Sequence, residues 1–204
     1  MPIKNSEMIN IKAIFTLRSV IRFTKLIRDG LVDDIPDLRT IGDEEKGMLN
    51  DVLVVFVLYH TETFYSEIIG NKRERGRFQS LLYRHFQELL QHNPKPLKEE
   101  MIKYIQEVDN GEYMFLGSRL CKDILGVEDF TVLMASVAVI KGYIPMMLRA
   151  CAYLWNLDEQ ECEMVRLDKE VRYLRKEYDV LYKGPIVKQG LIAWWKKMTS
   201  PLPK

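Results

Sequence analysis

A chain of 204 residues is long enough for one substantial hydrophobic core, and 47% hydrophobic with 29% charged residues is typical of a soluble globular protein. The formal net charge of +1 gives no general reason to expect nucleic acid or an acidic partner, because such affinity depends on many uncompensated Lys and Arg residues. We therefore expect a single domain over residues 1–204, with residues 157–204 as a C-terminal extension.

Two features of the chain indicate the cytosol. The stretch from Met1 to Asn10 contains no continuous apolar segment and does not resemble a secretory signal. The cysteines are odd in number and have no metal-binding spacing, which favours a reducing compartment: Cys121, Cys151 and Cys162.

The first part of the chain predicts two long helices. Apolar residues recur at helical spacing from Ile9 to Arg28, and Asp29-Gly30 is a typical helix end. An acidic loop follows over Leu31 to Gly42. The carboxylates of residues 43–45 suit the first turn of a second helix, Asp43 to Ile69, because they oppose the positive end of its dipole.

The segment from Val52 to Tyr59 is rich in β-branched residues and therefore also fits a buried strand. We favour a helix, because no Gly or Pro interrupts the chain between Gly47 and Gly70.

Glycine and proline divide the middle of the chain. Gly70 to Arg75 is predicted to be a basic turn, and a break at residues 93–96 carries two prolines, which disfavour helix in the residue before them. Three helices are expected around these breaks: Phe78 to Gln91, Leu97 to Val108, and Tyr113 to Leu125, the last ended by Gly126.

The most apolar segment runs from Phe130 to Trp155, but Lys141, Pro145 and Arg149 interrupt it. A bilayer-crossing helix needs about 20 predominantly apolar residues, and the longest charge-free run here is residues 130–140. We therefore predict a helix buried at the centre of a helical domain and bent at Pro145, with Val52 to Tyr59 as its buried neighbour.

The C-terminal region predicts an interaction element. Asp158 and Glu161 have the spacing of a capping box, which marks the start of a seventh helix. Within it, apolar residues alternate at three and four and form a heptad seam that fits either a dimer or the chain's own core: Met164, Leu167, Val171, Leu174, Tyr178 and Leu181. Glu170 and Arg175 would pair across parallel helices in such a dimer.

A short final helix is predicted from Ile186 to Met198. Trp194 and Trp195 lie on its apolar arc with lysines at the edges, a composition found at membrane interfaces. Docking on its own domain is the simplest interpretation, a protein partner comes next, and membrane contact is the third.

Lys141 and Arg149 are also candidates for binding a small molecule, together with His60 and Glu62. A Lys ammonium in apolar surroundings has a lowered pKa and can act as a base or nucleophile. The simpler interpretation is structural: both side chains extend to solvent or pair with an acid such as Glu62 or Glu67, and we predict that Lys141 is charged and paired.

The densest basic cluster suits a nucleic-acid strand, because cations neutralise phosphates and nearby aromatic rings stack on bases: Lys72, Arg73, Arg75, Arg77, Phe78, Tyr83 and Arg84. Glu74 interrupts this cluster, and a solvated turn is the simpler interpretation.

Motifs that carry catalysis are absent from the sequence. It contains no phosphate-binding glycine loop, no zincin motif, no nucleophile elbow and no Glu-x-x-His. We therefore expect no metal and no cofactor.

These patterns predict an all-α fold of seven or eight helices around residues 130–155. The function we expect is that of a non-enzymatic cytosolic interaction or regulatory protein acting through its C-terminal helices, with itself or another protein as partner. A helical enzyme or small-molecule binder with a core pocket near Lys141, and a nucleic-acid binder using Lys72 to Arg84, are the alternatives.

Overall fold

The structure is a computed structural model that describes residues 4–91, 106, 115–127 and 129–184. These residues form an all-α array without strands: α1 (Asn5–Asp34), η1 (Pro36–Arg39), α2 (Asp43–Ile68), α3 (Lys72–Gln91), α5 (Phe115–Arg119), the π-helix η2 (Leu120–Leu125), α6 (Phe130–Trp155), α7 (Glu159–Glu163) and α8 (Leu167–Lys183). The predicted fold class is confirmed.

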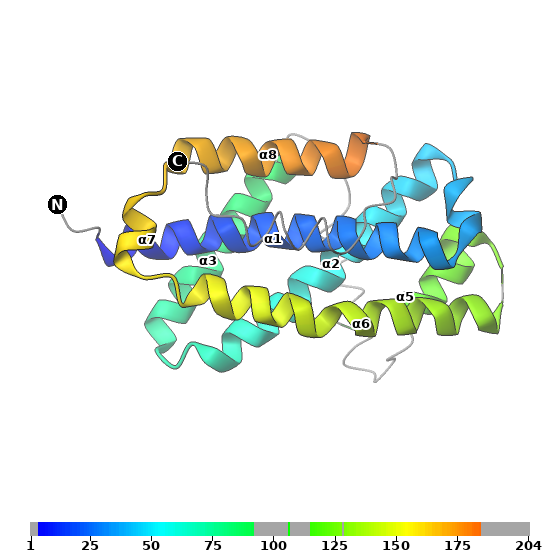
Figure 1. The fold of residues 1–204 in the computed structure, drawn as a ribbon, viewed down its shortest axis with the longest axis horizontal. Helices are drawn as coiled ribbons and strands as arrows, with labels where there is room; N and C mark the ends of the chain where they lie inside the picture. The colour runs from blue at the N-terminus through cyan, green and yellow to red at the C-terminus, as the bar shows by residue number, and fades with distance from the viewer. Residues whose placement is uncertain (1–3, 92–105, 107–114, 128, 185–204) are drawn as a thin grey trace.

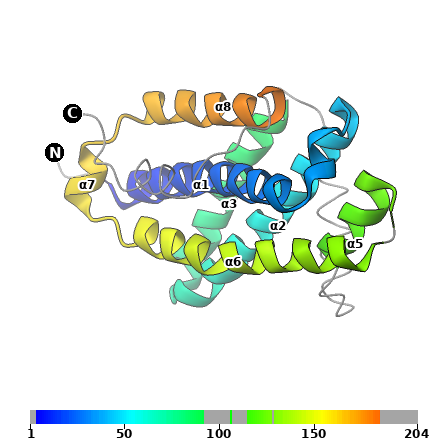
Figure 2. The same cartoon turned by 45° about the vertical axis from the view of Figure 1, so that its right-hand side comes forward.

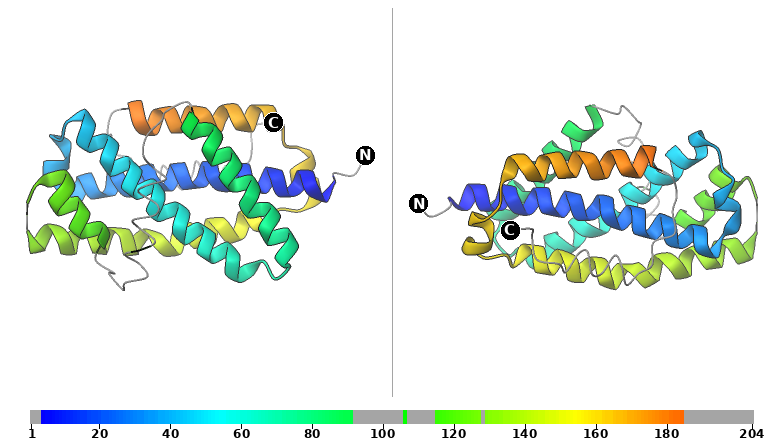
Figure 3. Two further views of the ribbon diagram at one scale, coloured as in Figure 1. Left: turned by 180° about the vertical axis from the view of Figure 1, so that it is seen from behind. Right: turned by 45° about the horizontal axis from the view of Figure 1, so that its top comes forward.

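The first helix, α1, occupies the centre of the array. In Figure 1, α8 and α6 run alongside α1 on opposite sides, and Figure 3 shows α2 and α3 crossing its far side diagonally. Most α1 residues between Ile9 and Val32 are buried. The central position predicted for residues 130–155 therefore belongs to α1, because α6 lies along one side of the array (Figure 2).

Several polar side chains of α1 are buried together with hydrogen-bond partners. Lys12 donates to the Trp155 carbonyl oxygen at 2.6 Å, and the Thr16 hydroxyl lies 3.1 Å from that of Tyr65. Asp29 accepts hydrogen bonds from other α1 side chains. Because such partners offset the cost of burial, the central helix does not have to be the most apolar one.

The helix α1 continues past the stop predicted at Asp29-Gly30. Gly30 lies inside α1, where α6 approaches so closely that a Cβ atom there would be 2.8 Å from the Tyr143 hydroxyl. Leu31 and Val32 add buried apolar surface beyond it. This tertiary packing overrides the local stop signal.

The second helix follows the prediction, and the segment Val52 to Tyr59 is helical rather than a strand. Every residue from Val52 to Leu58 is buried, and α2 packs mainly against α1. The run of β-branched residues here therefore reflects a helix that is buried on all sides.

The predicted basic turn at Gly70 to Arg75 is only partly correct. Asn71 accepts hydrogen bonds from the backbone N–H groups of Arg73 and Glu74, and this cap starts α3 at Lys72. The basic residues therefore lie in the first turn of a helix.

Local end signals succeed in the C-terminal half. Gly126 ends η2 with a left-handed φ of 65°, and α6 has the predicted bounds. Asp158 and Glu161 form the predicted capping box, but it starts the short α7 and not the long α8. The predicted helices Leu97 to Val108 and Ile186 to Met198 lie outside the described residues, apart from Gln106, which is helical.

Candidate functional site

The helix α6 is strongly apolar, yet few of its side chains are fully buried. Of its side chains that the structure describes, only Ser136, Met147 and Cys151 are buried. Its exposed residues include a stripe along one face, which we call the α6 outer face: Phe130, Met134, Ala138, Lys141, Pro145, Arg149 and Tyr153. Phe130 is 72% exposed, and Tyr153 near the other end is 64% exposed.

The opposite side of α6 is fixed to the array. The Tyr65 hydroxyl donates to the Cys151 carbonyl oxygen at 2.9 Å, and Lys12 binds the carbonyl oxygen of Trp155 in the last turn. A Cβ atom on Gly117 of α5 would lie 2.6 Å from Leu133 Cδ1, so this glycine permits the close packing of α5 on α6. The outer face is therefore presented on a well-packed support.

The start of α6 is capped by a carboxylate. Asp129 accepts hydrogen bonds from the backbone N–H groups of Thr131 at 2.7 Å and Val132 at 3.3 Å. These bonds stabilise the charged form and lower the pKa of Asp129. The cap supports the first turn of α6, where Phe130 is too exposed to contribute much packing.

The two cations of α6 lie at the surface. Lys141 and Arg149 are both exposed, and no ion pair of either one occurs within the described part of the chain. The buried pairing expected for Lys141 is therefore wrong, because the helix turns this residue away from the core. The helix contains no Asp or Glu, so its outer face carries positive charge alone.

The structure separates the other predicted small-molecule residues from these cations. Glu62 of α2 accepts hydrogen bonds from Gln79 at 3.1 Å and from the Tyr83 hydroxyl, both on α3. His60 contacts the rings of Phe56 and Tyr59. Burial lowers the pKa of His60, which favours its neutral form.

The heptad seam of α8 faces the chain's own core. Leu174, Tyr178 and Leu181 are buried in the central cluster, and Leu167 and Val171 pack against it. These seam residues therefore pack against the core of their own chain, which is the second of the two arrangements expected from the sequence, and not against a second copy.

Of the two residues expected to pair across a dimer, Glu170 belongs to the intramolecular contact with α1 and Arg175 does not. Glu170 accepts a hydrogen bond from Arg18 of α1 at 2.6 Å, and Glu177 accepts one from Arg22 at 2.9 Å. Arg175 is exposed on the outer surface of α8. These ion pairs fix α8 along α1.

A buried polar cluster joins the far end of α8 to the core, and sequence reasoning missed it. The Arg28 side chain is fully buried. Its Nη1 donates to the Leu181 carbonyl oxygen at 2.7 Å and to Asn50 Oδ1 at 3.2 Å. Its Nε and Nη2 both donate to Asp29 Oδ1. Burial lowers the pKa of Arg28, and Asp29 opposes this shift. The only sequence signal was the i,i+4 spacing of Lys25 and Asp29, which form an ion pair at 2.6 Å.

The basic cluster of α3 does not extend onto α1. Arg75 donates to the Ser66 carbonyl oxygen at 2.5 Å, whereas Arg73, Arg77 and Arg84 are exposed. The basic residues of α1 that could have enlarged the cluster, Arg18 and Arg22, are paired with α8. The contiguous surface that would favour nucleic acid is therefore not assembled from these elements.

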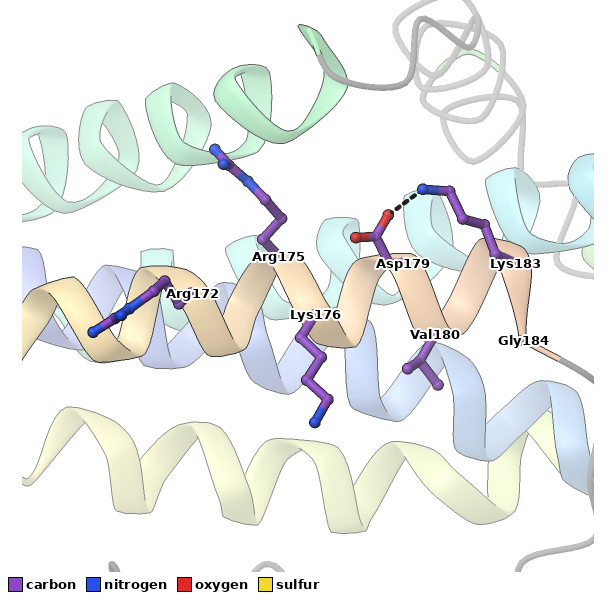
Figure 4. A pocket seen from close by; sticks show the side chains of 7 residues that line it. All are labelled: Arg172, Arg175, Lys176, Asp179, Val180, Lys183 and Gly184. Carbon is purple, nitrogen blue, oxygen red and sulfur yellow. Dashed lines mark hydrogen bonds and ion pairs between the residues drawn. The ribbon is translucent and has the colours of Figure 1, made fainter.

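A shallow pocket of about 540 Å³ lies on α8 and is lined by Arg172, Arg175, Lys176, Asp179, Val180, Lys183 and Gly184 (Figure 4). Lys183 pairs with Asp179 at 2.8 Å. Arg175 and Lys183 point to one side of α8 in this view and Lys176 to the other. The cations thus do not converge on one ligand-sized position.

Metal and thiol chemistry gain no support from the residues that the structure describes, which contain no group of three or more metal-ligating side chains. All three cysteines are free and buried. Burial raises the pKa of Cys151 to about 11, so its thiol is protonated and weakly reactive. Trp194 and Trp195 lie outside the described residues.

No protein-family model, curated protein or solved structure matches the chain. Within the described residues, α6 is the one helix that is long and apolar enough to cross a membrane by length and composition. Core helices of soluble proteins also meet this criterion, but they are mostly buried, whereas only 12% of the most apolar window of α6 is buried.

Proposed function

We propose that this chain is a non-enzymatic helical interaction protein of the cytosol, and that its binding surface is the α6 outer face. The observation that carries the proposal is that α6 is rich in apolar residues, yet its outer face is exposed to solvent. Large apolar side chains such as Phe130 and Met134 remain in contact with solvent. Extended exposed apolar surface on a folded protein commonly marks an interaction site.

The interaction surface we propose therefore lies on α6 and not on the seam of α8 that the sequence favours. The seam residues pack on α1, and a partner could reach them only by displacing α8. The α6 outer face needs no such rearrangement, because its supporting contacts with α1, α2 and α5 lie on the other side of the helix.

A covered outer face can be detected by cysteine labelling. We would compare Met134→Cys with Met164→Cys, a matched control because Met164 is also exposed and lies outside α6. The native cysteines are buried and contribute little background. In purified protein both variants should react with a maleimide, whereas in the cells that make the protein Met134→Cys should react several-fold more slowly.

Equal labelling of the two variants in cells would contradict the proposal, because a surface used for binding is protected while it is occupied. Circular dichroism of both purified variants checks that the helices are retained.

A further inference from the structure

We infer that the α6 outer face lies on an anionic lipid surface, with α6 in the plane of the membrane interface. The inference rests on the proposed function and names the partner of the same surface. Three properties of the face support lipid as the occupant: its length, its charge and the position of its aromatic residues.

The apolar surface extends along the whole of α6. A helix of 26 residues is about 39 Å long at 1.5 Å per residue. Along one edge of the outer face, Ile144 and Leu148 are partly buried against the central cluster, so the stripe adjoins further apolar surface there. A long apolar surface on one side of a molecule suits an interface that is itself extended and flat.

The charge of the face complements anionic lipid. Lys141 and Arg149 provide positive charge in the middle of the face, and α6 itself has no Asp or Glu; the exposed carboxylate beside the face is the N-cap Asp129 at its end. Both side chains are long enough to place their charged ends among headgroups while their methylene stems remain in apolar surroundings.

Aromatic residues lie near both ends of the outer face. Phe130 is the first residue of α6, and Tyr153 lies in its last turn. Both rings are largely exposed. Tyr is enriched at the boundary between headgroups and acyl chains, because its ring has an apolar body and a polar end.

The contacts of α6 with the array favour an in-plane position over a span. Its carbonyl groups at Cys151 and Trp155 accept hydrogen bonds from Tyr65 and Lys12, and Met147 is buried in the central cluster. A spanning helix would have to leave all of these contacts.

A second copy of the chain fits the face less well. Pairing of two α6 helices would bring Lys141 and Arg149 near the same residues of the other copy, and neither helix could supply a carboxylate. Like charges in one interface oppose association. Protein partners of any kind are treated as alternative outcomes below.

The inference is tested by flotation of the purified full-length protein with vesicles. The probes are vesicles of phosphatidylcholine alone and of phosphatidylcholine mixed with phosphatidylglycerol. We expect flotation with the mixed vesicles at about 0.05 M salt, and much weaker flotation at about 0.5 M salt, where surface charges are screened.

Two apolar variants locate the contact on α6. Phe130→Glu and Met134→Glu should each weaken vesicle binding about tenfold, because a carboxylate on the face opposes both insertion and anionic lipid. Met164→Glu is the matched control and should bind as the wild type does. Phe130→Glu is also compatible with folding, because a carboxylate in the first turn of a helix is favourable.

Two double variants test whether vesicle binding depends on the charges of α6 or only on the net charge of the whole protein. Lys141→Gln with Arg149→Gln should weaken binding about 25-fold, since each basic residue near an anionic surface contributes about fivefold. Arg175→Gln with Lys176→Gln changes the net charge by the same amount on α8 and should have little effect. Equal losses in the two double variants would overturn the assignment to α6.

The remaining outcomes separate this inference from the proposed function. If the wild type fails to float, or floats equally with neutral vesicles, the lipid assignment is wrong. If Met134→Cys is nevertheless protected in cells, the outer face binds a protein and the proposed function stands. A dimer in light scattering that Met134→Glu dissociates would identify that protein as a second copy.

Discussion

The buried cation Arg28 allows a quantitative test of how α8 is attached. Removing Asp29 leaves the guanidinium buried without its carboxylate, and breaking such a pair from one side costs about 3–5 kcal/mol. Replacing the cation should cost less free energy of unfolding. In Arg28→Met an apolar side chain fills part of the space, and Asp29 retains its ion pair with Lys25. The Leu181 carbonyl oxygen retains the hydrogen bond from the Asn50 amide at 3.2 Å. We expect Arg28→Met to cost about 1–3 kcal/mol, for its lost hydrogen bonds.

Urea unfolding and thermal unfolding, both followed by circular dichroism, measure the free energy of unfolding and the melting temperature of both variants. Because about 1 kcal/mol shifts the melting temperature by 2–4 °C in a protein of this size, Asp29→Ala should lower it by about 10 °C. Asp168→Ala is a matched control, since Asp168 pairs with Arg172 at 3.0 Å on the surface. Such exposed pairs contribute about 0–1 kcal/mol. A loss from Asp29→Ala no larger than that of the control, or smaller than the loss from Arg28→Met, would refute the reasoning.

Three further predictions concern packing and pH. Gly142→Ala should raise the free energy of unfolding by about 0.5–1 kcal/mol, because a Cβ atom there would meet no atom within 4 Å. Gly117→Ala should lower the free energy of unfolding by about 1–3 kcal/mol, because the added methyl group overpacks the contact with Leu133. Urea unfolding of both variants tests this contrast. Leu174→Asp should unfold the chain rather than dissociate a dimer, since Leu174 is 2% exposed; retained helicity by circular dichroism would contradict this. Burial holds the pKa of His60 in the folded state below the unfolded value of 6.5, so the unfolded state binds more protons and the free energy of unfolding falls as the pH drops below 6.5 towards the folded pKa. In urea unfolding, His60→Leu should reduce the loss of this free energy between pH 7.5 and 5.5. An unchanged loss would exclude His60 as its source.

The sequence predicts helix ends well where the end depends on nearby residues. Gly126 adopts the left-handed conformation that ends a helix, and Asp158 and Glu161 bind each other's backbone N–H groups. The stop predicted at Gly30 fails because α6 packs against that glycine from a position more than a hundred residues away. No window of local sequence contains that contact.

The candidate site could be predicted only in part, because composition does not say which side chains are covered. The bounds of the helix at residues 130–155 are predicted correctly, but its position at the side of the array is not. Burial depends on neighbours supplied by distant segments, and here α1 takes the place that the more apolar α6 was expected to fill. The partners of Arg28 on α2 and α8 were equally invisible for the same reason.

The contrast between α1 and α6 gives the strongest argument about function. Helix α1 carries buried polar residues, and its own fold provides partners for side chains such as Lys12 and Arg28. Helix α6 shows the opposite relation, since it carries more apolar surface than its own fold covers. Core packing explains Met147 and Cys151, but it does not explain Phe130 or Met134, which remain 72% and 44% exposed. An environment outside the chain that accepts both apolar side chains and cations would explain why Phe130 and Met134 share one helix with Lys141 and Arg149.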